Sequence, residues 1–339
     1  MEIVFVHFGP KYPKHLILNL RRTCELFPEI SVVLITDLSD PIKINNANFH
    51  KSYFRMSSDY RVLNNLLSHP KNFRNNFWFT SLARIFALCD YVITKNVSIL
   101  HIESDVLVSG DIPIDRFAKC DRPIAFTVVG RGSGVASVMW INNATAAINL
   151  RDYAGKTAEA DPMTTDMKIL GHFQRDNPQL VRILASFPTE SGESYKSLPP
   201  DVLEDFKYTT NLFGGYFDAA DLGRYLLGDD PRNHRGMKHL REELDTSYFI
   251  PREVKYHYSV SRNFLDTDST PNSRFFSLHI HSKNIDAFKS EKVGEVLSRA
   301  IRSQDKPQGQ TLVLSVLVNS IKHSLARRLR VLIAGHEKN

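Results

Sequence analysis

The sequence predicts an α/β fold in which a mixed, mainly parallel sheet is flanked by helices. An apolar run over 3–9, an amphipathic stretch over 14–28 and a second apolar run over 31–37 give strand, helix and strand in succession. This order makes a βαβ unit, whose strands lie parallel and whose helix covers one face of the sheet. Further apolar runs of strand length then alternate with helical patterns along the chain.

The remaining elements are expected in the same alternation. The segment 191–233 is rich in Gly, Pro and Asp and is expected to form loops. Hydrophobic periodicity predicts the other elements, which are strands over 99–102, 123–129, 135–143 and 274–288, helices over 76–93, 144–154, 294–303 and 311–335, and a helix that opens within 161–170. We expect one domain over 1–290, with halves 1–110 and 111–290, and a C-terminal helical extension over 291–339.

The bulk composition excludes several classes of protein. The chain has 339 residues, of which 42% are hydrophobic and 24% charged, as in ordinary globular proteins. The net charge of +6 fits anionic partners such as phosphates. The basic residues are not clustered with aromatic ones, so nucleic acid is not an expected partner. The three cysteines show no Cys-x-x-Cys spacing, which argues against a disulfide framework or a zinc site.

The expected location of the protein is the cytoplasm. Its low cysteine content fits a reducing compartment. The chain starts directly with a strand rather than with a basic segment and an apolar core, so no signal peptide is expected. It also has no apolar run long enough to predict a membrane-spanning helix.

The stretch 98–111, SILHIESDVLVSGD, carries the most informative motif. Its apolar strand ends in Glu103 and Asp105, two carboxylates one residue apart. Burying charge is costly unless the charge is paired or bound to a metal. Ligands bind at the carboxyl ends of strands in parallel sheets, and carboxylate oxygens are natural ligands of Mg²⁺ and Mn²⁺. The two side chains could therefore share one ion; the alternative is a pair of solvated carboxylates at a strand end.

Taken together, these features resemble the GT-A-type glycosyltransferases, which use nucleotide-sugar donors. The resemblance rests on the N-terminal βαβ unit, the helix that carries Arg84, the strand that ends in an acidic triplet, a later helix led by Asp, and a late His. It covers roughly 1–290, is strongest over 78–150, and is similar to glycosyltransferase families 8 and 32. The triplet of such enzymes is usually Asp-x-Asp. Because Glu103 stands first here, Asp105 is the firmer expected ligand.

The resemblance implies a donor pocket in the first, nucleotide-binding half of the domain. The ends of the first two strands hold the base and ribose in this fold, and the matching residues are His7, Phe8, Gly9 and Asp37. Arg84 matches an arginine near the diphosphate or sugar, and a guanidinium binds phosphate bidentately. Ser104 is a further expected donor contact. The alternatives are a turn or cap role for Asp37 and a structural ion pair for Arg84.

The late segment 278–284, LHIHSKN, resembles the part of the family that supplies a metal-binding His and a phosphate-contacting Lys. His279 and His281 recur at period two, on one face of a strand. An imidazole nitrogen suits Mn²⁺. His281 lines up with the family's segment and is the expected ligand, with Lys283 on the diphosphate. The usual His-x-Gly pattern is absent, and a hydrogen-bonded His with a surface Lys is the alternative.

The expected catalytic residue is Asp166, in TTDMKIL. A carboxylate near the anomeric carbon could activate the acceptor hydroxyl, and the start of a helix favours a negative charge. The alternatives are an ordinary helix-start Asp and, as second candidate in the same loop, Asp161. The segment with His281 and Lys283 indicates retention of configuration, whereas Asp166 acting as a base indicates inversion, so the stereochemistry stays open.

Sugar contacts are expected in the second, acceptor-side half of the domain. Aromatic faces stack on sugars and carboxylates bind pairs of hydroxyls. The candidates after the two glycines are Tyr216, Phe217 and Asp218. The resemblance also places Trp140 and Asn142 on a strand that helps to hold the donor sugar. Packed loop and core positions are the alternatives for these residues.

The segment 311–335 predicts a basic amphipathic helix. Its first third is nearly all apolar, and its later part adds Lys322, Arg327, Arg328 and Arg330. Such a helix can lie on an anionic membrane surface, which would suit an enzyme that extends lipid-linked glycans. Packing on the protein's own core or in a dimer is the alternative.

The expected function is transfer of a sugar from a nucleotide sugar, with a UDP-sugar as the expected donor, assisted by Mn²⁺ or Mg²⁺. The acceptor class, a surface polysaccharide, a lipid-linked glycan or another glycoconjugate, is an analogy with the family. Two alternatives remain. A nucleotidyltransferase would open with a Gly-rich loop, which HFGPKYPKH lacks. A non-catalytic nucleotide- or carbohydrate-binding module with a degenerate metal site is kept open by Glu103.

Overall fold

The computed structural model describes residues 1–55, 58–71, 73–74, 76–189, 198–228, 248–249, 251, 254–267 and 274–304. The chain divides into a compact unit over Met1–Ser298 and a second over Arg299–Asn339. The fold and site below belong to the first unit. The helix predicted over 311–335 lies outside the described residues.

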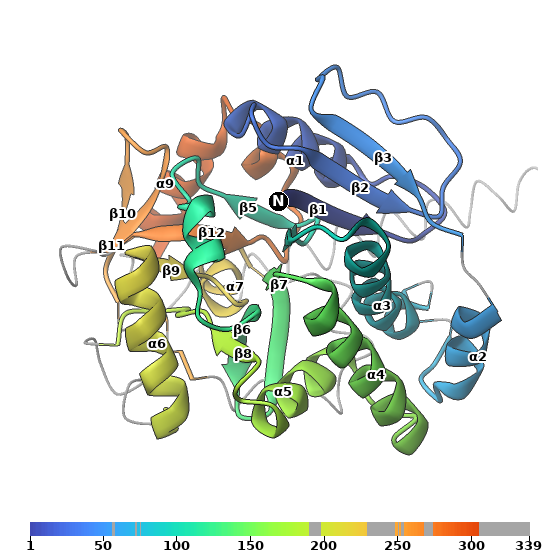
Figure 1. The fold of residues 1–339 in the computed structure, drawn as a ribbon. Helices are drawn as coiled ribbons and strands as arrows, with labels where there is room; N and C mark the ends of the chain where they lie inside the picture. Colours follow the sequence, from blue (N-terminus) through green and yellow to red (C-terminus); the bar gives the residue numbers. More distant parts are fainter. Residues whose placement is uncertain are drawn as a thin grey trace, which may run out of the picture. The chain divides into compact units, whose positions relative to one another are not determined.

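A seven-stranded sheet forms the centre of the first unit (Figure 1). Its strands, in the order β3-β2-β1-β4-β7-β6-β8, are β3 (Phe49–Tyr53), β2 (Val32–Thr36), β1 (Glu2–His7), β4 (Ile99–Ile102), β7 (Ser133–Ile141), β6 (Ile124–Gly130) and β8 (Val181–Ile183). Neighbours pair in parallel except β7, which lies antiparallel between β4 and β6. The predicted α/β class with a mixed, mainly parallel sheet is confirmed.

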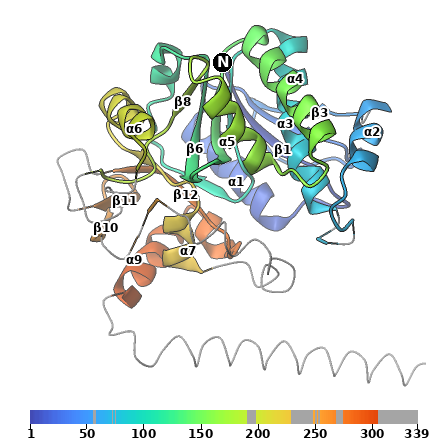
Figure 2. The same ribbon diagram turned by 90° about the horizontal axis from the view of Figure 1, so that it is seen from below.

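Helices cover both faces of this sheet (Figures 1 and 2). The described residues as a whole, including those beyond the sheet, form α1 (Lys14–Leu26), α2 (Ser58–Leu66), α3 (Phe77–Lys95), α4 (Ala144–Ala160), α5 (Asp166–Asp176), α6 (Pro200–Phe213), α7 (Asp221–Leu227) and α9 (Val293–Gln304), with the 3₁₀ turns η1 (Ile114–Lys119) and η6 (Ile285–Phe288). Helix α9 starts in the first unit and ends in the second. On one face, Phe5 of β1 shares a core with Leu16 and Leu20 of α1. On the other, α3, α4 and α5 share a second core.

A small three-stranded sheet brings the late part of the chain to the acidic triplet. Its order is β5 (Val106–Val108), β12 (Phe275–His279) and β9 (Tyr216–Phe217). β12 pairs antiparallel with β5, so that His279 lies opposite Val106. A separate hairpin joins β10 (Tyr256–Ser259) to β11 (Phe264–Thr267). The β5–β12 pairing therefore places residues far apart in sequence at one end of the central sheet.

The segment predicted to be loops contains regular structure instead. Its described part holds α6, β9 and α7. Helix α6 begins at Pro200 and is capped at its C-terminus by Gly214, whose φ of +78° suits glycine. Its buried face includes Val202, Phe206 and Phe213. In the described part of this segment, the Gly and Pro residues that suggested loops lie mostly at the boundaries of short elements.

Helix α3 is the one element among the described residues that is long and apolar enough to cross a membrane by length and composition. Of its most apolar window, 56% is buried inside the protein. The helix packs against β1, α4 and α5. It is therefore accounted for as a core helix.

Helix α5 approaches the turn between β6 and β7 so closely that Gly171 has no room for a side chain. A Cβ there would lie 2.2 Å from the carbonyl group of Gly132. We predict that Gly171→Ala lowers the free energy of unfolding by about 1–3 kcal/mol, because the helix has to move away. The measurement is urea denaturation followed by circular dichroism.

The matched control is Gly155→Ala in α4, where an added Cβ meets nothing within 4 Å. This change is expected to raise the free energy of unfolding by about 0.5–1 kcal/mol, because alanine favours the helix and restricts the unfolded chain. Effects of the same sign in the two variants would contradict the close approach of α5.

Candidate active site

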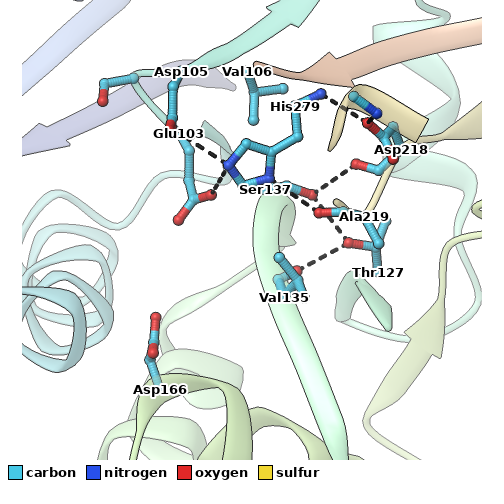
Figure 3. Close-up of polar contacts among 12 residues, drawn as sticks. Glu103, Asp105, Val106, Thr127, Val135, Ser137, Asp166, Asp218, Ala219 and His279 are labelled. Carbon is cyan, nitrogen blue, oxygen red and sulfur yellow. Dashed lines mark hydrogen bonds and ion pairs between the residues drawn. The ribbon is translucent and has the colours of Figure 1, made fainter. Parts of the chain in front are cut away.

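Glu103, Asp105 and His279 converge at the carboxyl end of β4 (Figure 3). Nε2 of His279 lies 3.4 Å from Oε2 of Glu103 and 3.6 Å from Oδ1 of Asp105. All three side chains are buried. Adjacent ligands around an octahedral Mg²⁺ at ~2.1 Å lie roughly 3 Å from each other. The separations and the oxygen and nitrogen donors therefore fit one shared divalent cation.

Each of the two carboxylates divides its oxygens between a basic side chain and His279. Oδ2 of Asp105 accepts from the ammonium group of Lys283, and Oε1 of Glu103 forms an ion pair with Arg84. The other oxygen of each carboxylate is the one that faces Nε2 of His279. Arg84 and Lys283 thus each take one carboxylate oxygen, and the second oxygen of each carboxylate is left directed at Nε2 of His279.

Arg84 extends the cluster to the predicted catalytic carboxylate. Its Nη2 lies 2.9 Å from Oδ2 of Asp166, the first residue of α5. The N-cap is Thr165, whose hydroxyl accepts from the backbone N–H of Lys168. Acids and bases consequently alternate through the site in the order Asp166, Arg84, Glu103, His279, Asp105 and Lys283.

The burial of these groups is compensated by their partners to different extents. Burial would lower the pKa of His279, but Asp105 and Glu103 raise it to about 9. Burial would raise the pKa of Asp105, but Lys283 and His279 outweigh it and hold that pKa well below its usual range. Burial raises the pKa of Asp166, and Arg84 offsets only part of this effect. Asp166 is accordingly the more basic of these two carboxylates, which suits a proton acceptor.

Helix α1 fixes the acidic triplet from behind. Asn19 is fully buried and donates from Nδ2 to the carbonyl oxygens of Ser104, at 3.3 Å, and Val106, at 2.8 Å. Nε2 of His15 lies 3.5 Å from the hydroxyl of Ser104, the side chain predicted to contact the nucleotide sugar. The sequence reasoning missed Asn19. The available signal was a polar residue within the apolar stripe of a helix.

His279 is favoured over the expected His281 as the nitrogen ligand. Nδ1 of His279 lies 3.1 Å from the carbonyl oxygen of Ala219, and since a carbonyl can only accept, Nδ1 carries the hydrogen. His281 follows the end of β12, and its ring stacks on that of His279 with 4.0 Å between centroids. Nε2 of His281 is buried without a hydrogen-bond partner and stays outside the cluster.

The residues predicted to hold the nucleotide lie together at the same edge of the sheet. His7 ends β1, and Phe8 and Gly9 follow it. The backbone N–H of Gly9 is 3.4 Å from Oδ1 of Asp37, just after β2. Because β1 pairs in parallel with both β2 and β4, these chain ends and Glu103 face the same side of the sheet.

The residues predicted to contact sugars are not exposed at this edge, although Asp218 bonds to the backbone of His279. Trp140, Tyr216, Phe217 and Asp218 are each at most 3% exposed and belong to the interior. β7 runs antiparallel to β4, with Ile141 opposite Ile99, so exposed Asn142 lies at the far end of β4 from the triplet. This corrects the placement of Trp140 and Asn142 near the site. The second-choice base, Asp161, caps the end of α4 and is exposed.

Comparison with known proteins gives matches in structure only. No protein family and no curated protein matches the sequence. Galactosyltransferase LgtC, solved with donor and acceptor sugar analogs, aligns at 13% identity over 91% of this chain and 98% of that one, with a TM-score of 0.39. GlyE of Streptococcus pneumoniae aligns at 18% identity over 54% and 45%, with a TM-score of 0.36. Mouse xyloside xylosyltransferase 1 aligns at 8% identity over 54% and 84%, with a TM-score of 0.36.

These solved structures are glycosyltransferases, the class that the sequence resembles.

We predict that Arg84→Met lowers the free energy of unfolding by about 3–5 kcal/mol, because it leaves Glu103 and Asp166 buried without their cation. The measurement is urea denaturation at neutral pH. The control is Arg151→Met, which breaks the more exposed pair with Asp90 and is expected to cost about 1 kcal/mol or less. Equal losses in the two variants would show that Arg84 does not balance buried charge.

Proposed function

We propose that the protein is a glycosyltransferase that depends on a divalent cation and moves a sugar from a nucleotide-sugar donor to a glycan or lipid-linked acceptor. The observation that carries the proposal is the convergence of Glu103, Asp105 and His279. The cluster lies at the carboxyl end of β4, with Arg84 and Lys283 in contact with its carboxylates. Two oxygens and one imidazole nitrogen suit Mn²⁺ or Mg²⁺.

Glu103, Asp105 and His279 would hold the cation, and the cation would supply charge stabilisation to the leaving diphosphate. Lys283 and Arg84 are placed to contribute to the same task, because ammonium and guanidinium groups bind phosphate oxygens. In the described structure both are already beside the carboxylates. Sugar transfer needs such positive charge where the diphosphate leaves.

Asp166 is the proposed proton acceptor for the acceptor hydroxyl. It stands at the start of α5, is largely buried, and is linked to the cation cluster through Arg84. The rise in its pKa on burial makes it a better base than an exposed aspartate. The anomeric configuration of the product would report whether Asp166 acts in an inverting reaction.

The donor, the acceptor and the location are proposed from the residues predicted to hold the nucleotide and from the sequence. We propose a UDP-sugar as the donor, held by His7, Phe8, Gly9 and Asp37. The proposed acceptor is a surface polysaccharide, lipid-linked glycan or other glycoconjugate. We further propose a cytoplasmic location at the inner face of a membrane, supported by the basic, partly apolar sequence of 311–335.

The direct test is thermal unfolding with nucleoside diphosphates and nucleotide sugars, each with and without Mn²⁺. We predict that one nucleotide raises the melting temperature of the wild type only with Mn²⁺, because a ligand bound to the native state stabilises it. Asp105→Asn should abolish this shift. Asp115→Asn, which changes an exposed carboxylate of η1, should preserve it.

A nucleotide shift of equal size without Mn²⁺, or one retained in Asp105→Asn, would contradict the proposed cation site. Metal-dependent binding without sugar transfer to any acceptor would favour the non-catalytic binding module.

The two histidines can be separated by Mn²⁺ affinity. We predict that His279→Gln weakens Mn²⁺ binding by more than about tenfold, since even the partners of a ligand contribute that much. His281→Gln should leave the affinity unchanged, because its Nε2 lies outside the cluster. Free Mn²⁺ is measured by electron paramagnetic resonance. The reverse result would restore His281 as the ligand.

A further inference from the structure

Asp218 holds His279 from the side opposite the two carboxylates (Figure 3). Its Oδ2 accepts from the backbone N–H of His279 and of Gly223, both at 2.9 Å. Its Oδ1 accepts from the backbone N–H of Leu222 at 3.1 Å. Asp218 is only 1% exposed, and its carboxylate accepts from these three backbone donors.

The residue after Asp218 controls the imidazole ring of His279. The carbonyl oxygen of Ala219 accepts from Nδ1 at 3.1 Å. This bond assigns the hydrogen to Nδ1 and leaves Nε2 on the side of Glu103 and Asp105. The backbone and the ring of His279 are therefore both fixed by two consecutive residues.

The approach of α7 to β12 depends on the absence of a side chain at Gly223. A Cβ there would lie 1.8 Å from the carbonyl oxygen of His279. Glycine at this position allows the start of α7 to present its N–H groups to Asp218 while Asp218 still reaches the N–H of His279. The contact between α7 and β12 therefore depends on both Gly223 and Asp218.

Ser137 of β7 connects this arrangement to the other side of the cluster. Its hydroxyl donates to the carbonyl oxygen of Asp218 at 3.2 Å. Its own carbonyl oxygen accepts from the backbone N–H of Glu103 at 3.0 Å. A single buried residue thus ties the strand that carries the first carboxylate to the residue that holds the imidazole.

We propose that Asp218 is a positioning residue that, with Ala219 and Gly223, orients His279 for cation binding. We name these three residues the His279 clamp. A histidine ligand generally donates its second ring N–H to a partner that fixes its orientation and tunes the site. Here that partner is the carbonyl oxygen of Ala219. Asp218 keeps this carbonyl beside β12 through its bond to the backbone N–H of His279. This inference deepens the proposed function and rests on its cation site.

The test is the affinity for Mn²⁺ alone, measured on the full chain from free Mn²⁺ by electron paramagnetic resonance. We predict that Asp218→Asn weakens binding by about ten- to a hundredfold, the usual effect of losing a ligand's partner. The control is Asp205→Asn in α6. Asp205 is also buried, accepts from the backbone N–H of Ile183 at 3.0 Å and pairs with Arg182. Asp205→Asn should lower the melting temperature and leave the Mn²⁺ affinity unchanged.

A second variant keeps the test available if Asp218→Asn does not fold. Ser137→Ala removes the hydroxyl that donates to Asp218, together with its 3.0 Å contact to the Thr127 hydroxyl, and retains the backbone bond to Glu103. We expect Mn²⁺ affinity to fall about three- to tenfold, the worth of the one neutral hydrogen bond to Asp218. Unchanged affinity in this variant would then overturn the clamp.

The outcomes separate the clamp from the proposed function. If the wild type binds Mn²⁺ and Asp218→Asn binds it equally well, the clamp is overturned and the cation site stands. If Asp218→Asn and Asp205→Asn weaken binding alike, the effect is general loosening, and the clamp is also overturned. If the wild type binds no Mn²⁺, the cation site itself fails, and with it the proposed function.

Discussion

The cost of burying three carboxylates governs the arrangement of this protein. Glu103, Asp105 and Asp166 are each at most 9% exposed. Charges in such positions are tolerated when each has a close partner of opposite sign. The partners come from separate elements, since Arg84 stands on α3 and Lys283 follows β12. Bringing them together requires the helical layer and the small sheet to meet at the end of β4.

The topology provides this meeting point through two pairings. β4 lies inside the seven-stranded sheet, so the chain leaving it emerges at the edge where parallel strands end. β12 then pairs with β5 and carries His279 to the same place. Buried polar residues hold these segments, with Asn19 bonded to the carbonyls after β4 and Asp218 bonded to the end of β12. These hydrogen bonds between packed layers thus fix the positions of the side chains in the cluster.

Structural charge balance and the proposed chemistry use one set of residues. Arg84 and Lys283 neutralise the carboxylates and are also the groups best suited to phosphate oxygens. The inner oxygens of Glu103 and Asp105 remain directed at Nε2 of His279. A site organised in this way is stable through internal ion pairs and offers donors that a divalent cation can use.

The sequence by itself determined the α/β class and strands β1, β2, β4, β6 and β7 of the central sheet, but not β3 and β8. It also identified Glu103, Asp105 and Asp166 as candidates. Hydrophobic periodicity and strand ends are local properties, and carboxylates at a strand end are recognisable without distant contacts. Tertiary structure decided what depends on pairing between remote segments. The antiparallel direction of β7 removed Trp140 from the site, and the carbonyl of Ala219 selected His279 over its neighbour. The sequence pattern does not predict which strands pair or which way an imidazole nitrogen points, because both are set by packing between distant segments.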